Sequence, residues 1–420
     1  MTIELINTGA ELLVGRILNT HQQWLCRQLT DLGYEVSQQV CVPDEGSRIQ
    51  TAVREALARA DVVITTGGLG PTSDDLTRDY IAKLLERNLV LHPPTRDWIA
   101  KFFASRKRPM PARVQVQAMI PEGATVLPNP NGTAPGLAMD AGKKCLILLP
   151  GPPRELRPMF RESVVPLLRE KFPLATKFLC HTFKTTGLGE SVVEEKIAPA
   201  LQPLVQRGLE IAYCARVGEV DVRLAARGEK ADALVAQGKE IVTNLLGPII
   251  FGTEDDSLEA VVVGLLTAAN KTLAVAESCT GGYIANRLTN VPGASKVFLG
   301  GVISYSNAVK QRQLGVTAES LRRSGAVSKP VATQMAEGAR RRLHADYALA
   351  VTGIAGPGGG TAKKPVGTAF IALSDGRKTL VHLQYSPVDR ETFKFVVSQR
   401  ALDILRISLL SGSAPADGPR

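Results

Sequence analysis

The chain has 420 residues, of which 44% are hydrophobic and 21% are charged, and this balance excludes a protein that is disordered over most of its length. At roughly 150 residues per domain, it corresponds to two or three domains with buried cores. The longest apolar stretch, residues 258–269, contains Glu259 and is too short to cross a bilayer core of about 30 Å. The N-terminal sequence MTIELINTGAELL lacks the basic region of a signal peptide, so we expect a cytoplasmic protein.

The formal net charge of +10 is a mild excess that suits phosphate-bearing small molecules as well as nucleic acid. The six cysteines form no C-x-x-C pair, and the five histidines include no H-E-x-x-H motif. The sequence therefore indicates neither a disulfide framework, nor a zinc finger, nor a histidine-rich metal site.

Strands and helices alternate in the first segment of the chain. Apolar periodicity predicts strands over residues 3–7, 35–42, 62–66 and 145–149, and helices over residues 21–32, 48–60 and 77–85. This order implies a parallel sheet with helices on both faces.

The pattern changes after about residue 170. A small α+β domain is predicted from strands over residues 177–185, 210–215 and 221–225 and helices over residues 191–204 and 231–246. The polar stretch 252–257 is predicted to be a linker or a helix start. A second α/β segment follows, with helices over residues 258–270, 330–343 and 390–410 and strands over residues 272–276, 297–304, 347–352 and 366–372.

The clearest motif of the first segment is the loop TTGGLGPTSDDLT, residues 65–77, between a buried strand and a helix. Gly67, Gly68 and Gly70 allow close backbone approach, and the helix start offers N–H groups to an anion. Asp74 and Asp75 would place carboxylates beside a phosphate, where a divalent cation binds. The alternative is a tight turn with an acidic helix start, which the helix dipole favours by itself.

Two further loops, NPNGTAPG (residues 129–136) and PGPPRE (residues 150–155), lie near predicted strand ends. Ligands bind beyond the carboxyl ends of strands in open α/β sheets, although both loops could be plain structural turns. Glu11 and Asp44 also follow strands and could add acidic ligands, or could simply be solvated.

In the last segment, the motif AESCTGG (residues 276–282) leads from a strand directly into Ser278 and then into a helix. Such a corner exposes a hydroxyl and directs backbone N–H groups toward a developing oxyanion. The alternatives are that Ser278 is a simple helix N-cap and that Cys279 is the nucleophile, although a lone cysteine is more often a buried thiol.

A serine nucleophile needs a base, and neither His344, late on a helix, nor His382, within a strand, lies at a strand end. Lys310, in YSNAVK (residues 305–310), does follow a strand, and burial can keep a lysine neutral. A solvated surface lysine is the alternative. The loops TGIAGPGGG (residues 352–360) and KKPVG (residues 363–367) would form a glycine-rich, cationic wall suited to phosphate, or a flexible loop without a ligand.

These motifs resemble the competence/damage-inducible CinA family over nearly the whole chain, to about Leu410. The resemblance implies two three-layer α/β domains with mostly parallel sheets, joined by a small α+β KH-like domain. It implies a molybdopterin-binding-like domain over residues 1–172, a KH-like domain over 175–250, a nicotinamide mononucleotide deamidase domain over 255–412 and a disordered tail over 413–420. The middle segment lacks the basic G-x-x-G loop of RNA-binding KH domains, so we do not expect it to bind nucleic acid.

The deamidase-like domain would hydrolyse the amide of nicotinamide mononucleotide. The resemblance implies Ser278 as nucleophile, Lys310 as base and Tyr305 as an orienting hydroxyl. The substrate would contact Thr280, Gly281, Gly282, Asn307, Gly353, Gly356, Gly358, Gly359, Lys364 and Gly367.

The first domain would cleave the diphosphate of ADP-ribose with a divalent metal ion of the Mg or Co class, held by Asp44, Asp74 and Asp75. Its substrate contacts would be Gly67, Gly68, Gly70, Thr72, Asn131 and Gly132. The deamidase domain would need no cofactor, and the protein would be a homodimer that does not bind membranes. Two competing hypotheses are a first domain that only binds molybdopterin or a nucleotide, and an accessory factor for DNA uptake or repair.

Overall fold

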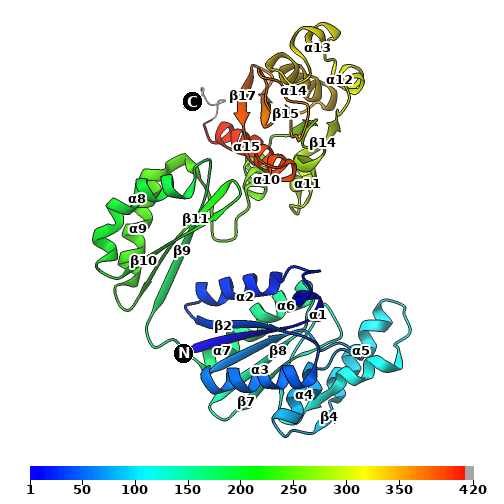
Figure 1. The fold of residues 1–420 in the computed structure, drawn as a ribbon, viewed down its shortest axis with the longest axis vertical. Helices are drawn as coiled ribbons and strands as arrows, with labels where there is room; N and C mark the ends of the chain where they lie inside the picture. Colours follow the sequence, from blue (N-terminus) through cyan, green and yellow to red (C-terminus); the bar gives the residue numbers. More distant parts are fainter. Residues whose placement is uncertain (412–420) are drawn as a thin grey trace. The chain divides into compact units, whose positions relative to one another are not determined.

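The computed structural model describes residues 1–411, which form two compact units, Met1–Cys180 and a second from His181 onward. Both units are built from sheets covered by helices (Figure 1). None of the helices within residues 1–411 is both long and apolar enough to cross a membrane.

A six-stranded sheet forms the centre of the first unit, in the order β2-β1-β3-β8-β7-β6. Its strands are β1 (Thr2–Thr8), β2 (Glu35–Val42), β3 (Val62–Thr66), β6 (Thr125–Leu127), β7 (Gly136–Ala141) and β8 (Lys144–Leu149). The strands β1, β2, β3 and β8 run parallel, as predicted, whereas β6 and β7 are antiparallel to their neighbours.

Helices cover both faces of this sheet because its buried strands carry apolar side chains on both faces. Ile3 and Leu5 of β1 pack on one face, with helices α2 (Thr20–Asp31), α6 (Pro153–Met159) and α7 (Val165–Lys171) and the π-helical turn η2 (Phe160–Val164). Ile6 packs on the other face, with α3 (Gly46–Arg59) and α4 (Thr77–Leu84). This alternation is the period of two expected of a strand buried on both sides.

The segment between α4 and β6, for which the sequence gives no prediction, forms a small substructure of its own. It contains β4 (Leu89–Leu91), α5 (Pro93–Ser105), the 3₁₀ helix η1 (Ala112–Ala118) and β5 (Met119–Pro121). A separate core of Ile99, Val114 and Ala118 supports it, and β4 pairs antiparallel with β5. The short helix α1 (Ala10–Leu13) follows β1.

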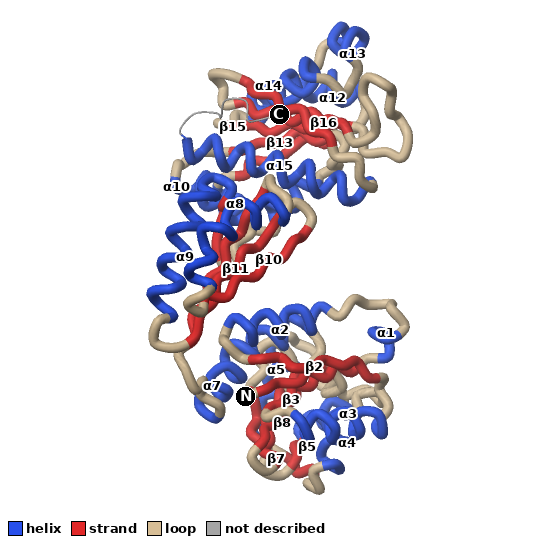
Figure 2. Tube along the Cα trace, turned by 60° about the vertical axis from the view of Figure 1, so that its left-hand side comes forward, coloured by secondary structure: helices blue, strands red, loops and turns tan. Residues whose placement is uncertain are grey.

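The second unit begins with a four-stranded sheet in the order β10-β11-β9-β12, with α8 (Glu190–Val205) and α9 (Ala231–Leu246) side by side along it (Figure 2). Its strands are β9 (Phe178–Thr186), β10 (Leu209–Arg216), β11 (Glu219–Arg227) and β12 (Ile250–Thr253), and β12 follows the 3₁₀ turn η3 (Gly247–Ile249). We call residues 181–253 the KH-like region. The predicted linker at 252–257 is wrong at its start, because Gly252 and Thr253 pair with β9. Its end does begin a helix, since the Ser257 side chain accepts from the Ala260 N–H.

A five-stranded sheet completes the second unit, in the order β14-β13-β15-β16-β17. Its strands are β13 (Leu273–Glu277), β14 (Phe298–Ile303), β15 (Tyr347–Gly353), β16 (Thr368–Ser374) and β17 (Thr379–Tyr385). Its helices are α10 (Leu258–Ala268), α11 (Tyr283–Thr289), α12 (Asn307–Leu314), α13 (Ala318–Ser324), α14 (Lys329–Leu343) and α15 (Arg390–Ser411), with a 3₁₀ turn η4 (Ala294–Lys296). Strand β13 is parallel to β14 and β15, whereas β16 is antiparallel to both of its neighbours, β15 and β17.

The two faces of this sheet differ in the size of their side chains. Leu273 and Val275 face α10, α11 and α15, whereas Ala274 and Ala276 face α14. Small side chains on the second face let α14 approach the strands closely, and the carboxyl end of β13 stays fixed between two helical layers. The predicted tail 413–420 lies outside the described residues.

Candidate functional site

Ser278 directly follows β13, a central strand of the five-stranded sheet, and only 8% of it is exposed. The preceding residue, Glu277, has a buried carboxylate that accepts hydrogen bonds from the N–H groups of Gly282, Ile284 and Ala285 at 2.9–3.1 Å. A carboxylate at this position satisfies free donors at the start of α11. These hydrogen bonds connect the end of β13 to the start of α11 and so fix the loop between them, which carries Ser278.

Lys310, on α12, brings its amine to Ser278. The Nζ atom lies 3.0 Å from Ser278 Oγ and donates to the carbonyl oxygen of Ser304 at 2.6 Å and to that of Tyr305 at 3.5 Å. Lys310 is 1% exposed. The structure thus joins two predicted residues that are far apart in the sequence.

The surroundings of Lys310 favour a neutral amine, because burial lowers its pKa below the ordinary value. A neutral amine has two N–H donors and one lone pair. The carbonyl oxygens of Ser304 and Tyr305 can take the two donors, which leaves the lone pair for the hydroxyl proton of Ser278. This is the arrangement that a serine nucleophile and its base require.

Cys279, the alternative nucleophile, is 6% exposed. Burial raises the pKa of its thiol to about 12. Since the thiolate is the reactive form of cysteine, this environment disfavours Cys279 as a nucleophile.

The loop behind Ser278 offers fewer free N–H groups than the sequence suggests. The N–H of Gly281 donates to the carbonyl oxygen of Ser278, and that of Gly282 donates to Glu277. Within residues 1–411, the N–H groups of Cys279 and Thr280 have no oxygen acceptor, and the buried Thr280 Oγ1 has no hydrogen-bond partner. The donors available to an oxyanion are therefore those of Cys279 and Thr280.

The structure does not bring the Tyr305 hydroxyl to Ser278. Tyr305 is 62% exposed, and its hydroxyl accepts a hydrogen bond of 2.7 Å from Arg390, the first residue of α15. Arg390 also donates to the carbonyl oxygen of Gly356 at 2.7 Å. Asn307, at the start of α12, is exposed.

The end of β15, where the glycine-rich loop begins, lies against this corner. Gly353 lies against Cys279, and a Cβ atom there would be 3.0 Å from the Cys279 sulfur. Lys364 donates to the carbonyl oxygen of Ser324 at 2.6 Å, so its amine already has a partner. The other predicted glycines of this wall are Gly356 and Gly359, both at positive φ, Gly358 in open space, and Gly367 at φ +97°.

In the first unit, a cavity of about 590 Å³ lies at the carboxyl ends of β1, β3 and β8. Six of the predicted residues line it: Gly67, Gly68, Gly70, Asp44, Asp74 and Asp75. Glu11, His21 and Glu155 line it as well. Burial lowers the pKa of His21, and the nearby Arg157 lowers it further.

The carboxylates of this cavity influence one another. Burial raises the pKa of Asp44, and the negative charges of Glu11, Asp74 and Asp75 raise it further. Carboxylate oxygens suit a hard divalent cation, which would relieve this repulsion. Within residues 1–411, however, no three His, Cys, Asp or Glu side chains are placed closely enough to hold a metal ion.

The remaining predicted residues brace the loops around the cavity. Thr72 donates its N–H to Asp75 Oδ2 at 2.8 Å, and its hydroxyl donates to the same oxygen. Asn131 donates to the carbonyl oxygen of Arg154 at 3.1 Å, and the carbonyl oxygen of Gly132 accepts from Trp98 at 3.3 Å.

Three residues of these sites escape sequence reasoning. The signal for Glu277 is local, because a carboxylate stands five residues before a glycine that begins a helix. Arg390 carries no local signal, since its partners lie 34 and 85 residues away. His21 lies in an ordinary amphipathic helix, and only the fold places it in the cavity.

A Ser–Lys pair at the end of one sheet and a glycine-rich, carboxylate-lined cavity at the end of another define a multidomain α/β protein with two candidate sites. Residues 4–170 match the family model "Probable molybdopterin binding domain". Residues 181–252 match "Damage-inducible protein CinA KH domain", and residues 255–409 match "CinA C-terminal domain".

Similarity to whole proteins extends over almost the full chain. A CinA-like protein of Akkermansia muciniphila is 46% identical over 405 residues, which cover 95% of each chain. A CinA-like protein of Kosmotoga olearia is 43% identical over 415 residues, or 98% of this chain and 99% of the relative. The chain therefore belongs to the CinA family.

Among solved structures, the competence/damage inducible protein CihA from Agrobacterium tumefaciens is 41% identical, with a TM-score of 0.36, and the match covers 36% of this chain and 93% of that chain. CinA from Thermoplasma acidophilum is 33% identical, with a TM-score of 0.37, and the match covers 40% of this chain and 97% of that chain.

Proposed function

We propose that the C-terminal part of the chain hydrolyses the carboxamide of nicotinamide mononucleotide to nicotinate mononucleotide and ammonia. The observation that carries this proposal is the buried pair of Ser278 Oγ and Lys310 Nζ, 3.0 Å apart, in surroundings that favour a neutral amine. A hydroxyl activated by a neutral lysine can attack an amide. The choice of substrate follows from the family resemblance.

The reaction proceeds through an acyl-serine. Ser278 Oγ bonds to the carboxamide carbon while its proton moves to Lys310 Nζ, and the N–H groups of Cys279 and Thr280 donate to the oxyanion that forms. When the carbon–nitrogen bond breaks, Lys310 returns the proton to the leaving ammonia. Water then attacks the acyl-serine and transfers a proton through Lys310 to Ser278 Oγ, which restores the free enzyme.

The 5′-phosphate of the substrate binds along the wall formed by Arg390 and the glycine-rich loop. The Arg390 guanidinium donates to the hydroxyl of Tyr305 and to the carbonyl oxygen of Gly356. A guanidinium is well suited to a phosphate because it presents paired donors in one plane. Lys364 and Asn307 complete the polar groups of this wall.

Ammonia release from nicotinamide mononucleotide by the purified full-length protein tests this function. We expect turnover of the mononucleotide and a much lower kcat/KM for nicotinamide riboside, which lacks the phosphate. Ser278→Ala serves as the inactive control. If the wild-type protein releases no ammonia, the proposal fails.

We also propose that the first unit cleaves the diphosphate of ADP-ribose with the aid of a divalent cation held by Asp44, Asp74 and Asp75. The donors fit such an ion in chemical type, because the three carboxylates line one cavity and the charges of Asp74 and Asp75 raise the pKa of Asp44. Their spacing in this structure is too wide for all three to bind one ion, so holding it would require the loops to move closer together. A bound divalent cation would neutralise phosphate charge and lower the pKa of its bound water. Gly67, Gly68 and Gly70 line the cavity, and each packs so tightly against Thr8, Thr77 or Asp75 that a Cβ atom would not fit there.

Cleavage of ADP-ribose with and without Mg²⁺ or Co²⁺ tests this second activity. Phosphate-ester products in the presence of metal support it. Binding of ADP-ribose without turnover would show instead that this domain only holds a nucleotide. We further propose that the protein acts in the cytoplasm as a homodimer, which sedimentation of the full-length chain can measure.

A further inference from the structure

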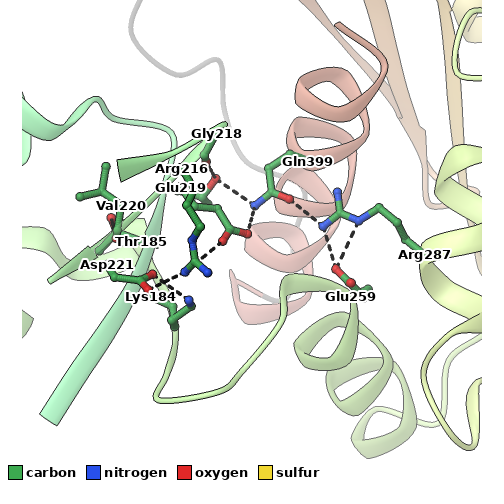
Figure 3. Close-up of polar contacts among 11 residues, drawn as sticks. Lys184, Thr185, Arg216, Gly218, Glu219, Val220, Asp221, Glu259, Arg287 and Gln399 are labelled. Atoms are coloured by element: carbon green, nitrogen blue, oxygen red, sulfur yellow. Dashed lines mark hydrogen bonds and ion pairs between the residues drawn. The ribbon is translucent and has the colours of Figure 1, made fainter. Parts of the chain in front are cut away.

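One turn of the KH-like region contacts helix α15 (Figure 3). This turn joins β10 to β11 and contains Gly218, whose φ is +73°. A Cβ atom at Gly218 would lie 3.4 Å from Cγ of Gln399, on α15. That distance is an ordinary van der Waals contact, so it is the positive φ of the turn that favours glycine at this position.

Gln399 connects the two sides of this contact. It is 2% exposed, and its Nε2 donates to Glu219 Oε1 at 2.9 Å and to Thr186 Oγ1 at 3.4 Å. Its Oε1 accepts a hydrogen bond of 2.7 Å from Arg287. Both ends of one buried amide thus have partners, Glu219 and Thr186 from the KH-like region and Arg287 from α11.

The Arg287 guanidinium is almost fully buried and has polar partners on α10 and α15. It pairs with Glu259 of α10 at 2.7 Å and donates to Ser398 of α15 at 2.9 Å, and it is 7% exposed. A buried guanidinium depends on such partners because unpaired burial of a charge is costly. The position of α11 is therefore tied to the acceptor that Gln399 presents.

Glu219 helps to fix which end of the Gln399 amide faces Arg287, because it is the nearer of two acceptors for Nε2, at 2.9 Å, and Thr186 Oγ1 lies at 3.4 Å. An amide has an acceptor at one end and donors at the other, and Glu219 accepts only from the donor end. Without Glu219, the donor end of the amide keeps only the longer contact to Thr186, so the oxygen that accepts from Arg287 is held less firmly. The carboxylate on the KH-like region thus stabilises the orientation that Arg287 needs.

The helix α11 leads directly to the candidate active site. It begins at Tyr283, one residue after Gly282, and Glu277 holds its first N–H groups. The same loop carries Ser278 and the N–H groups of Cys279 and Thr280, which have no oxygen acceptor within the described part of the chain. A small shift of α11 therefore moves the groups that would contact the oxyanion.

We propose that Glu219 and Gln399 are positioning residues for the amidase site, so that the KH-like region supports catalysis by holding α11. This inference rests on the proposed amide hydrolysis. In this proposal, the partner of the KH-like region is helix α15 of the same chain, which Glu219 contacts through Gln399.

The test measures kcat and KM for ammonia release from nicotinamide mononucleotide with full-length variants. Glu219→Ala is expected to lower kcat about tenfold with KM within about twofold, the range found for residues that couple to a distant site. Glu219→Gln keeps an acceptor oxygen for Gln399 and should restore kcat to within about twofold of wild type. Glu210→Ala, an exposed carboxylate on β10, is the matched control and should leave kcat unchanged.

Hydrogen–deuterium exchange of the peptide covering residues 279–290 gives a second readout that does not need activity. Faster exchange is expected in Glu219→Ala and not in Glu210→Ala or Glu219→Gln. The proposal is overturned if Glu219→Ala has wild-type kcat and wild-type exchange. It is also overturned if Glu219→Gln lowers kcat as much as Glu219→Ala does. If the wild-type protein releases no ammonia, the proposed function fails, and the exchange comparison alone decides whether Glu219 holds α11.

Discussion

Ser278 and Lys310 act as one unit in the proposed reaction, because the hydroxyl loses its proton to the amine in the step that forms the acyl-serine. We expect Ser278→Ala and Lys310→Ala each to lower kcat at least about a hundredfold, and the double variant to be little worse than either. Cys279→Ala should keep most activity, since its thiol has a pKa of about 12. Ammonia release measures all four variants. An active Ser278→Ala with an inactive Cys279→Ala would make the cysteine the nucleophile.

The lowered pKa of Lys310 predicts how the rate depends on pH. Burial disfavours the charged amine, so a larger fraction is neutral at a given pH than for a solvated lysine with a pKa of about 10.4. Because only the neutral form accepts the serine proton, kcat/KM should rise with pH and level off above the pKa of Lys310. We expect the midpoint of this limb below about 10.4 in a series from pH 6 to 10. A rate that falls over this range would contradict a lysine base.

The residues of the site show what local sequence can and cannot predict. Ser278 follows a strand and Lys310 follows the next, so strand ends alone indicate that both lie at one edge of the sheet. The partners of Arg390 cannot be predicted in this way, because the first residue of the last helix reaches loops much earlier in the chain. The role of Gly282 also depends on geometry, since its N–H serves Glu277 and is not free for substrate.

Among the elements, the loop from β3 to α4 carries a testable pair of carboxylates. Asp74→Asn or Asp75→Asn should abolish metal-dependent cleavage of ADP-ribose and leave ammonia release unchanged, because each removes a charged ligand from the cavity of the first unit only. Assays of both activities on the same preparations provide the comparison. If both variants cleave the diphosphate at the wild-type rate, Asp74 and Asp75 do not hold a catalytic metal and serve only as negative charges near the start of a helix.

Two helical glycines provide a test of packing in the second unit. A Cβ atom at Gly338 of α14 would collide with the backbone carbonyl of Leu314, whereas Gly264 of α10 has open space around the same position. We expect Gly338→Ala to lower the free energy of unfolding by about 1–3 kcal/mol and Gly264→Ala to raise it by about 0.5–1 kcal/mol. Chemical denaturation measures both. Equal effects would mean that α14 can move away from Leu314.

Predictions of whole elements hold where apolar periodicity is long and regular, as for α9 and α14, whose buried residues recur at helical spacing. Such predictions fail where pairing with a strand distant in the sequence determines the secondary structure. Strand β12 has only four residues and a polar continuation, and its pairing with β9 makes it a strand. The substructure from β4 to β5 has short elements with a core of its own, and such a core cannot be recognised from periodicity.

At the scale of the whole molecule, the second unit should act independently of the first. A fragment that begins at Phe178, the first residue of β9, is expected to fold and to release ammonia at the wild-type rate without added metal, because the Ser–Lys pair and all its contacts lie within it. A shorter fragment from residue 253 should remain active but slower, since it loses Glu219. Loss of activity on treatment of the longer fragment with a chelator would contradict a metal-free site.

The buried Arg406 of α15 has a consequence for how the protein is made. Its guanidinium donates to the carbonyl oxygens of Pro248 and Ile250 and pairs with Asp403. The last residues of the KH-like region can therefore form these hydrogen bonds only when α15 is present. The same helix covers one face of the five-stranded sheet through Phe393, Val397 and Leu402. During synthesis on the ribosome, the second unit can therefore reach its final packing only after α15 has left the exit tunnel, whereas the first unit can already be folded by then.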